Sequence, residues 1–180
     1  LGTAVLGPII SIGGIVHLVH QGVMKITLFF AAGNYAETLG VHRVSEMNGA
    51  GSRMPWTSFA FTIGALGMIG VPPLAGYVSK WYLQNGGIEA GSTWISFVLS
   101  ASSLLNAAYF LPIIYRIWFC KAPQDWPKDR KFGRLETHWM LLAPPLITAV
   151  MIIYFGIFAE TPYSPLEWAK LIAKREYVTP

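Results

Sequence analysis

Four side chains that could take up and release protons lie within long apolar stretches of the sequence. His17, His20 and Lys25 share the first stretch, and Lys80 lies in the second. A charge near the middle of a bilayer costs about 3 kcal/mol or more, so such residues usually face a protein interior or water and mark ion or proton routes. Imidazoles titrate near neutrality, which suits them to proton transfer. We therefore interpret the four residues as a candidate proton relay linked by water.

The spacing in the first stretch gathers its polar groups on one side. At about 100° per residue, His17, His20, Gln21 and Lys25 fall within an arc of roughly 140° of a helix. A single polar residue would be explained by a lysine that extends to the interface, or by a hydrogen bond between helices. Four polar residues on one face favour the relay instead.

His17 and His20 also have a spacing that could hold a metal ion. No Cys, Asp or Glu lies in the same stretch to complete four ligands, so we predict no metal site. A metal transporter, the weaker alternative, would retain metal in a way that depends on both histidines. The single cysteine, Cys120, excludes an internal disulfide and an iron–sulfur cluster, and we predict no cofactor in this chain.

The second stretch contains a predicted helix break just before its lysine. Pro72 and Pro73 remove two backbone donors, so the helix must kink or break there, with Gly76 close by. Broken helix in a membrane is tolerated where protein or a water-filled cavity satisfies its backbone, and transporters place ion sites at such breaks. A straight helix from Trp56 would instead place Lys80 about 36 Å along, at the far interface. The spacing alone favours neither interpretation.

These residues need a membrane fold to position them. The 180 residues are 53% hydrophobic and 12% charged, with a mean hydropathy of +0.46, whereas soluble domains average about 25% charged residues. This composition excludes a disordered chain, a coiled coil, a nucleic-acid-binding domain and a soluble enzyme. We predict an all-α integral membrane protein.

About four transmembrane helices are expected, because a span needs about 20 mostly apolar residues. The predicted spans are 8–33, 56–82, 94–119 and 139–158. The second is broken at Pro72-Pro73, and the third contains Asn106, to which we assign packing and no chemistry. Residues 1–160 form the transmembrane part. Residues 161–180 form an amphipathic tail, in which 164–177 is a short helix at the membrane interface.

Basic residues predict the orientation of the spans. Eight lie in or beside the 34–55 and 120–136 connections, and three lie in the tail, so the two connections are expected to be cytoplasmic. The eight are Arg43, Arg53, Arg116, Lys121, Lys128, Arg130, Lys131 and Arg134.

Three runs of sequence resemble one known family. His17 to Gly33, HLVHQGVMKITLFFAAG, resembles the signature helix of the antiporter-like subunits, which are the large membrane-arm subunits of respiratory complex I and the large subunits of Mrp-type cation/proton antiporters. The runs MNGAGSRMP (47–55) and GVPPLAGYVSK (70–80) resemble the segments that come next along the chain in that family. The similarity covers about residues 8–120 in the same order and spacing.

The resemblance implies a larger fold with two inverted five-helix repeats, of which this chain would supply the end of the second repeat and one further helix. It matches Lys25 to the family's central lysine and Lys80 to the lysine of its second discontinuous helix. Many members have a histidine where Gln21 stands here, with His20 one residue earlier. The glutamate and lysine of the first repeat have no counterpart in this chain.

The combined expectation is translocation of protons, or of protons and sodium, by a Lys/His relay in a larger respiratory or antiporter complex. The host would be a complex I-like or group 4 hydrogenase-like oxidoreductase, or an antiporter, with no redox catalysis in this chain. Expected partners are the lipid bilayer and other membrane subunits, including one that supplies the N-terminal helices; no nucleic acid is expected. The expected location is the prokaryotic cytoplasmic membrane, with several passes. The alternative is a non-conducting membrane anchor. The chain starts at Leu1 without Met, which suggests a split subunit or part of a longer polypeptide.

Overall fold

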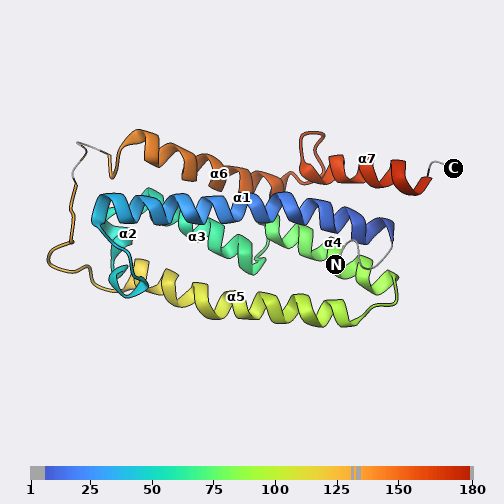
Figure 1. Ribbon diagram of the computed structural model, residues 1–180, viewed down its shortest axis with the longest axis horizontal. Helices are drawn as coiled ribbons and strands as arrows, with labels where there is room; N and C mark the ends of the chain where they lie inside the picture. Colours follow the sequence, from blue (N-terminus) through green and yellow to red (C-terminus); the bar gives the residue numbers. More distant parts are fainter. Residues whose placement is uncertain (1–6, 131, 133–134, 179–180) are drawn as a thin grey trace.

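The computed structural model describes residues 7–130, 132 and 135–178, and the described part is helical (Figure 1). The elements in chain order are α1 (Pro8–Leu39), the 3₁₀ turn η1 (Val44–Glu46), α2 (Ala50–Arg53), α3 (Pro55–Ile69), α4 (Ala75–Glu89), α5 (Trp94–Phe119), α6 (Trp139–Ile157) and α7 (Pro165–Val178). By length and composition, α1, α5 and α6 could each cross a membrane. The prediction of an all-α membrane protein is confirmed.

The first helix is longer than predicted. It begins with Pro8 in its first turn and ends at Leu39, followed by Gly40, whose left-handed backbone lets its N–H reach the Ala36 carbonyl. The predicted span ends at residue 33, because polar residues begin there. Those residues are buried instead: Asn34 and Thr38 each make hydrogen bonds to other elements. Polar side chains that find partners inside the protein do not end a helix.

The predicted break of the second span is present. Helix α3 ends at Ile69, where Gly70 (φ +93°) turns the chain and its N–H reaches the Leu66 and Gly67 carbonyls. Residues 70–74 are non-helical, and α4 then begins at Ala75. The two helices follow one another along α1 (Figure 1). Each has 15 residues and is about 22 Å long, which is shorter than the hydrocarbon core of about 30 Å. Only the two helices together are long enough to cross a bilayer.

Helix α1 is the centre of the bundle. It packs against α3, α4, α6 and α7, whereas α5 lies at the edge against α3 and α4 (Figure 1). The main core lies between α1, α3 and α6 and includes Met24, Tyr35, Phe61 and Ile152. The bounds of α5 are those predicted for the third span, and α6 lies within the predicted fourth span. The layout therefore leaves the broken α3–α4 pair between α1 and α5.

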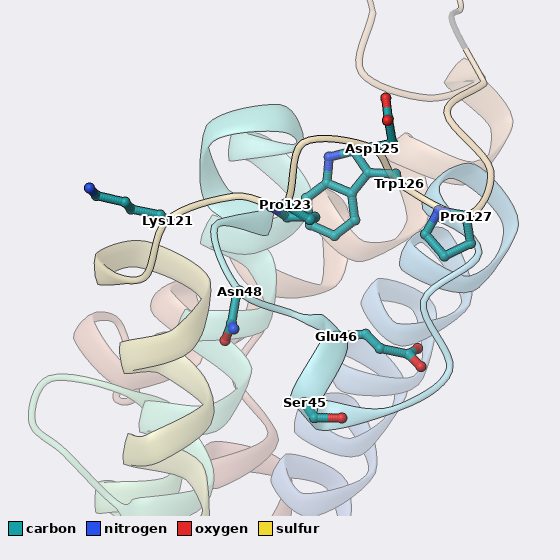
Figure 2. A pocket seen from close by; sticks show the side chains of 8 residues that line it. All are labelled: Ser45, Glu46, Asn48, Lys121, Pro123, Asp125, Trp126 and Pro127. Carbon is teal, nitrogen blue, oxygen red and sulfur yellow. The ribbon is translucent and has the colours of Figure 1, made fainter.

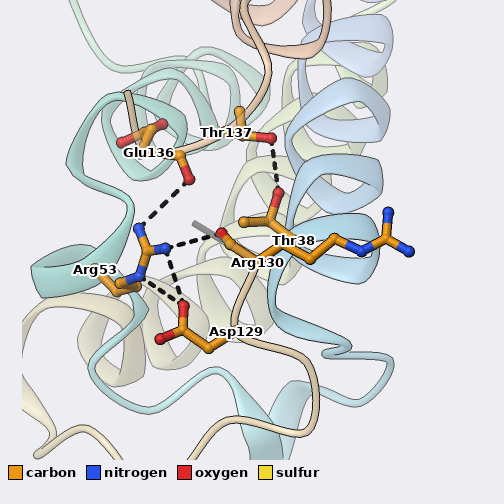
Figure 3. A network of polar contacts seen from close by, with 6 residues as sticks. All are labelled: Thr38, Arg53, Asp129, Arg130, Glu136 and Thr137. Carbon is orange, nitrogen blue, oxygen red and sulfur yellow. Dashed lines mark hydrogen bonds and ion pairs between the residues drawn. The ribbon is translucent and has the colours of Figure 1, made fainter. Parts of the chain in front are cut away.

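The two connections predicted to be cytoplasmic are joined to each other by polar contacts (Figure 3). Arg53 forms an ion pair with Asp129 at 2.9 Å and donates to the Arg130 carbonyl at 3.0 Å. Nearby, the hydroxyls of Thr38 and Thr137 lie 2.7 Å apart. After the end of α1, the 34–55 connection contains η1 and α2. Two of the eight basic residues, Lys131 and Arg134, lie outside the described part of the chain.

The predicted tail helix is present as α7. Its Leu166 and Ala169 are buried with Val16 of α1, as the amphipathic pattern predicts. Trp168 on the other side is exposed. Helix α7 runs beside the N-terminal half of α1 (Figure 1). Its place at the membrane interface, and the division of the chain at residue 160, stay predictions.

Candidate ion-translocation site

Lys80 folds back onto the helix break rather than outward to the far interface. Its Nζ donates to the carbonyls of Met68 (3.0 Å) and Ile69 (2.9 Å) and to Oγ of Ser103 (2.7 Å). The two carbonyls belong to the last turn of α3, where backbone acceptors are left without helical partners and the helix dipole is negative. The break thus supplies two acceptors and α5 supplies the third, one for each N–H group of an ammonium.

His17 connects α1 to the residue next to Lys80. Its Nδ1 lies 2.9 Å from Oγ of Ser79, and that hydroxyl donates to the Gly76 carbonyl at 3.2 Å. Because the hydroxyl has only one proton to donate, it accepts from Nδ1–H of His17. His17 therefore joins α1 to the beginning of α4, at the residue before Lys80.

His20 is the fully buried member of the set. Its Nδ1 donates to the Ala75 carbonyl at 2.7 Å, in the first turn of α4, and its ring stacks on Phe155 at 5.8 Å. Its Nε2 is buried without a hydrogen-bond partner among the described residues. With the ring proton on Nδ1, Nε2 carries a lone pair that can accept a proton.

Lys25 lies on a different side of α1 from His20. It is exposed, in line with Leu18 (78% exposed) and Phe29 (74% exposed), and makes no hydrogen bond within the described residues. The polar arc expected from the spacing is therefore divided. Helices α4 and α6 cover His20, whereas His17 and Gln21 are half-buried at the boundary. The predicted polar arc of about 140° on α1 is therefore wider than the part of the α1 surface that the neighbouring helices cover.

Three polar residues of α5 that are not among the predicted site residues lie at or beside this site. Ser103 contacts Lys80, Asn106 donates from Nδ2 to the Met68 carbonyl at 3.1 Å, and the Tyr109 hydroxyl donates to Oδ1 of Asn106 at 2.9 Å. Their spacing of three residues on an apolar helix was the available signal, because it places them on one side. Asn106 therefore joins α5 to the last turn of α3 by a hydrogen bond, and the prediction that it has no chemical role stays a prediction.

A groove beside Lys80 opens this site toward the outside of the bundle. It has a volume of about 410 Å³ and is lined by Lys80 and Gln84 of α4 and by Ser100 and Ser103 of α5, among others. A second pocket, of about 300 Å³, lies at the loop end of the bundle (Figure 2). It involves none of the four candidate carriers, and its charged side chains Glu46, Lys121 and Asp125 point in different directions (Figure 2).

The comparisons with known proteins identify the family. A family model described as NADH:quinone oxidoreductase/Mrp antiporter, transmembrane, matches residues 1–106. The chain belongs to this family. It is 38% identical over 168 residues to an NADH-quinone oxidoreductase subunit of Desulforudis audaxviator, covering 89% of this chain and 33% of that protein. It is 31% identical over 180 residues to an Na(+)/H(+) antiporter subunit of Bacillus subtilis, covering 98% of this chain and 35% of that protein.

Other relatives belong to further assemblies. Hydrogenase-4 component B of Escherichia coli is 28% identical over 167 residues, which is 85% of this chain and 24% of that protein. Among solved structures, a chain of the Mrp complex from Dietzia sp. DQ12-45-1b matches with a TM-score of 0.83 and 24% identity, covering 98% of this chain and 40% of that one. The resemblance to antiporter-like subunits is confirmed, and so is the fold. The chain spans about a third of the length of the first two relatives.

Proposed function

We propose that this chain translocates protons, or protons and sodium, as part of a larger antiporter-like assembly in a prokaryotic cytoplasmic membrane. The observation that carries the proposal is the hydrogen bond between His17 of α1 and Ser79, the residue before Lys80, whose own Nζ fills three acceptors at the helix break. Carriers on α1 and on the broken α3–α4 pair are thereby joined through one titratable group. The chain belongs to the family described as NADH:quinone oxidoreductase/Mrp antiporter, and this membership supports the same function.

The site around Lys80 accommodates both protonation states. As an ammonium, its Nζ fills three acceptors; as a neutral amine, it donates two N–H groups and holds a lone pair that can take a proton. Two of these acceptors are backbone carbonyls fixed by the end of α3, so the lysine can change its charge while the cradle keeps its shape. Lys80 would act as the terminal carrier, beside the groove between α4 and α5.

The two histidines would act as intermediate groups. Ser79 holds His17 with its proton on Nδ1, and Ala75 does the same for His20, so Nε2 of each ring is the proton-accepting atom. Water is a natural bridge between such groups where they are too far apart for a direct hydrogen bond. His17 would exchange protons with both lysines by this route, and His20 would extend the relay into the buried side of α1.

Lys25 would act as the central carrier, and its exposure implies a partner. An ammonium exposed to lipid beside Leu18 and Phe29 would be costly. We propose that further membrane helices, from another subunit or from the remainder of a longer polypeptide, cover this face of α1. Relatives about three times as long would have room for such helices. A coupling module elsewhere in the assembly would change the protonation of the lysines.

The test is proton uptake by vesicles that carry the whole assembly. Lys25→Ala and Lys80→Ala are each expected to lower the rate by about tenfold or more, because each removes a group that must carry the proton. Lys174→Ala, which alters an exposed lysine of α7, serves as the control and should leave the rate unchanged. Full uptake in both variants would overturn the relay and would leave the chain as a membrane anchor. Repeating the assay with and without a sodium gradient separates the two ions.

A further inference from the structure

We infer that Ser103 and Asn106 of α5 are positioning residues that set, in opposite directions, how firmly Lys80 holds its proton. The inference rests on the proposed function, in which Lys80 is a proton carrier. The sequence predicts no chemical role for α5. In the structure, however, it supplies one of the three acceptors of the Lys80 ammonium and a competitor for another.

The Met68 carbonyl is shared between two donors. Lys80 Nζ reaches it at 3.0 Å and Nδ2 of Asn106 reaches it at 3.1 Å. The side-chain amide of Asn106 is held in this orientation by Tyr109, whose hydroxyl donates to Oδ1 at 2.9 Å. Leu104 and Leu105 of the same helix are 72% and 68% exposed, so the polar residues occupy the side of α5 that faces the break.

Sharing this carbonyl makes release of the proton easier. When Lys80 gives up a proton, Nζ keeps the electron pair and loses one donor, and an acceptor would be left without a partner. Asn106 continues to satisfy the Met68 carbonyl, so this cost is smaller. In the charged state, Asn106 competes with the ammonium for the Met68 carbonyl and so weakens the hydrogen bond from Nζ. Both effects of Asn106 favour the neutral amine.

Ser103 has the opposite effect. Its Oγ accepts from Nζ at 2.7 Å, the shortest of the three contacts of the ammonium. Hydrogen bonds that involve a charged group are stronger than those between neutral groups, so this contact favours the protonated form. Ser103 also lines the groove of about 410 Å³, which places it where the proton would leave Lys80.

Few other titratable groups face Lys80. Helix α1 presents His17, whose ring is hydrogen-bonded to the neighbouring Ser79. Helix α3 contains no ionisable side chain, α6 contains only Tyr154, and the tyrosine of α5 nearest to Ser103 is Tyr109. Ser103→Ala leaves all of these groups and their contacts in place, and Asn106→Leu removes one further contact, the acceptor of the Tyr109 hydroxyl. A change in the proton affinity of Lys80 in Ser103→Ala can therefore be assigned to the Ser103 contact.

The test measures the protonation of Lys80 directly in the assembled complex. Only the neutral amine reacts with acetic anhydride, so competitive labelling over a range of pH, followed by mass spectrometry of the Lys80 peptide, gives the pH of half-maximal reaction. Ser103→Ala is expected to lower this pH by about one unit, because the ammonium loses a charge-assisted hydrogen bond. Asn106→Leu is expected to raise it, by less than that amount.

Ser102→Ala, an exposed neighbour on the same helix, is the matched control and should give no change. If the two residues had a purely structural role, both variants would shift the pH of half-maximal reaction in the same direction, by loosening the packing, or neither variant would shift it. Either result would overturn the inference. If Asn106→Leu prevents assembly, Ser103→Ala alone decides. The labelling does not depend on transport: failure of Lys80→Ala to lower proton uptake would remove the proposed function while leaving these shifts intact.

Discussion

The imidazole of His17 and the hydroxyl of Ser79 lie 2.9 Å apart and join α1 to α4 across 62 residues of sequence. The hydroxyl is buried and itself donates to the Gly76 carbonyl, so it fixes both the orientation of the ring and the nitrogen that carries the proton. A histidine held in this way presents the same proton-accepting atom, Nε2, each time a proton is transferred. This contact makes the beginning of α4 part of the proposed relay.

Ser79→Ala should therefore slow proton uptake by the assembled complex. Without the hydroxyl, the His17 ring can rotate or exchange its tautomer, and we expect a loss of about tenfold, within the range of misplaced proton-transfer groups. The measurement is the uptake rate in vesicles, normalised to the amount of assembled complex. Ser45→Ala, in the exposed η1 turn, is the control. An unchanged rate in Ser79→Ala would show that His17 needs no anchor on α4.

The close approach of α3 and α4 gives a second prediction. A Cβ atom added to Gly76 would lie 1.9 Å from the Gly67 carbonyl oxygen, which is backbone and cannot yield by rotating. Gly76→Ala should therefore push the two half-helices apart, lower the free energy of unfolding by about 3 kcal/mol or more, and reduce the yield of assembled complex. The check is thermal unfolding of the purified complex in detergent.

Gly33→Ala provides the matched control for that change. A Cβ at this position meets no atom within 4 Å among the described residues, and alanine favours a helix more than glycine does. We expect unchanged or slightly raised stability. Equal losses in both variants would mean that tight packing at Gly76 is not what holds the break together.

How local a feature is decides whether the sequence could predict it. The break at Pro72-Pro73 and the bounds of α5 depend on residues within one segment, and both were predicted. The partner of a side chain is different. Periodicity gives the side of a helix on which His20 lies, but only packing decides that α4 and α6 cover that side and leave Lys25 exposed. Resemblance to the family placed Lys80 at a discontinuous helix, whereas the role of Asn106 depended on a contact across 38 residues.

Glu136 illustrates the same limit and gives a third prediction. The carboxylate is buried just before α6 and accepts from the backbone N–H groups of Trp56 (2.8 Å) and Thr57 (2.7 Å) and from the Thr57 hydroxyl (2.6 Å). It thereby caps the N-terminus of α3, where a negative charge is favourable, although it lies 79 residues further along the chain than Thr57. Glu136→Ala leaves these donors without their acceptor, and we expect the free energy of unfolding to fall by about 2 kcal/mol.

Thermal unfolding of the complex measures this effect, with Glu89→Ala at the exposed end of α4 as its control. Glu136→Gln keeps one acceptor oxygen and should fall between the two. If Glu136→Ala were as stable as the control, the cap would contribute nothing and α3 would have to be positioned by its apolar contacts alone.

The last prediction concerns pH at the loop end of the bundle. The backbone N–H groups of His42 and Arg43 donate to Oε2 of Glu46 at 3.0 and 3.1 Å, and they hold the pKa of this exposed carboxyl below its ordinary value of 4.5. A carboxyl whose pKa is lower in the folded state stabilises the fold above the unfolded pKa, and this contribution is lost as the pH falls through the folded value. Residues 42–47 should therefore be well ordered at neutral pH and should open more often in acid.

Amide hydrogen exchange of residues 42–47 in the unaltered chain and in Glu46→Gln tests this, compared at each pH so that the intrinsic pH dependence cancels. The variant should exchange faster at neutral pH, and the difference should shrink below pH 4.5 as the native carboxyl also loses its charge. Asp125→Asn, across the pocket of Figure 2, should match the unaltered chain throughout. A difference that persisted in acid would show that the side-chain shape of Glu46, and not its charge, orders this turn. The turn would then be insensitive to the proton concentration on its side of the membrane.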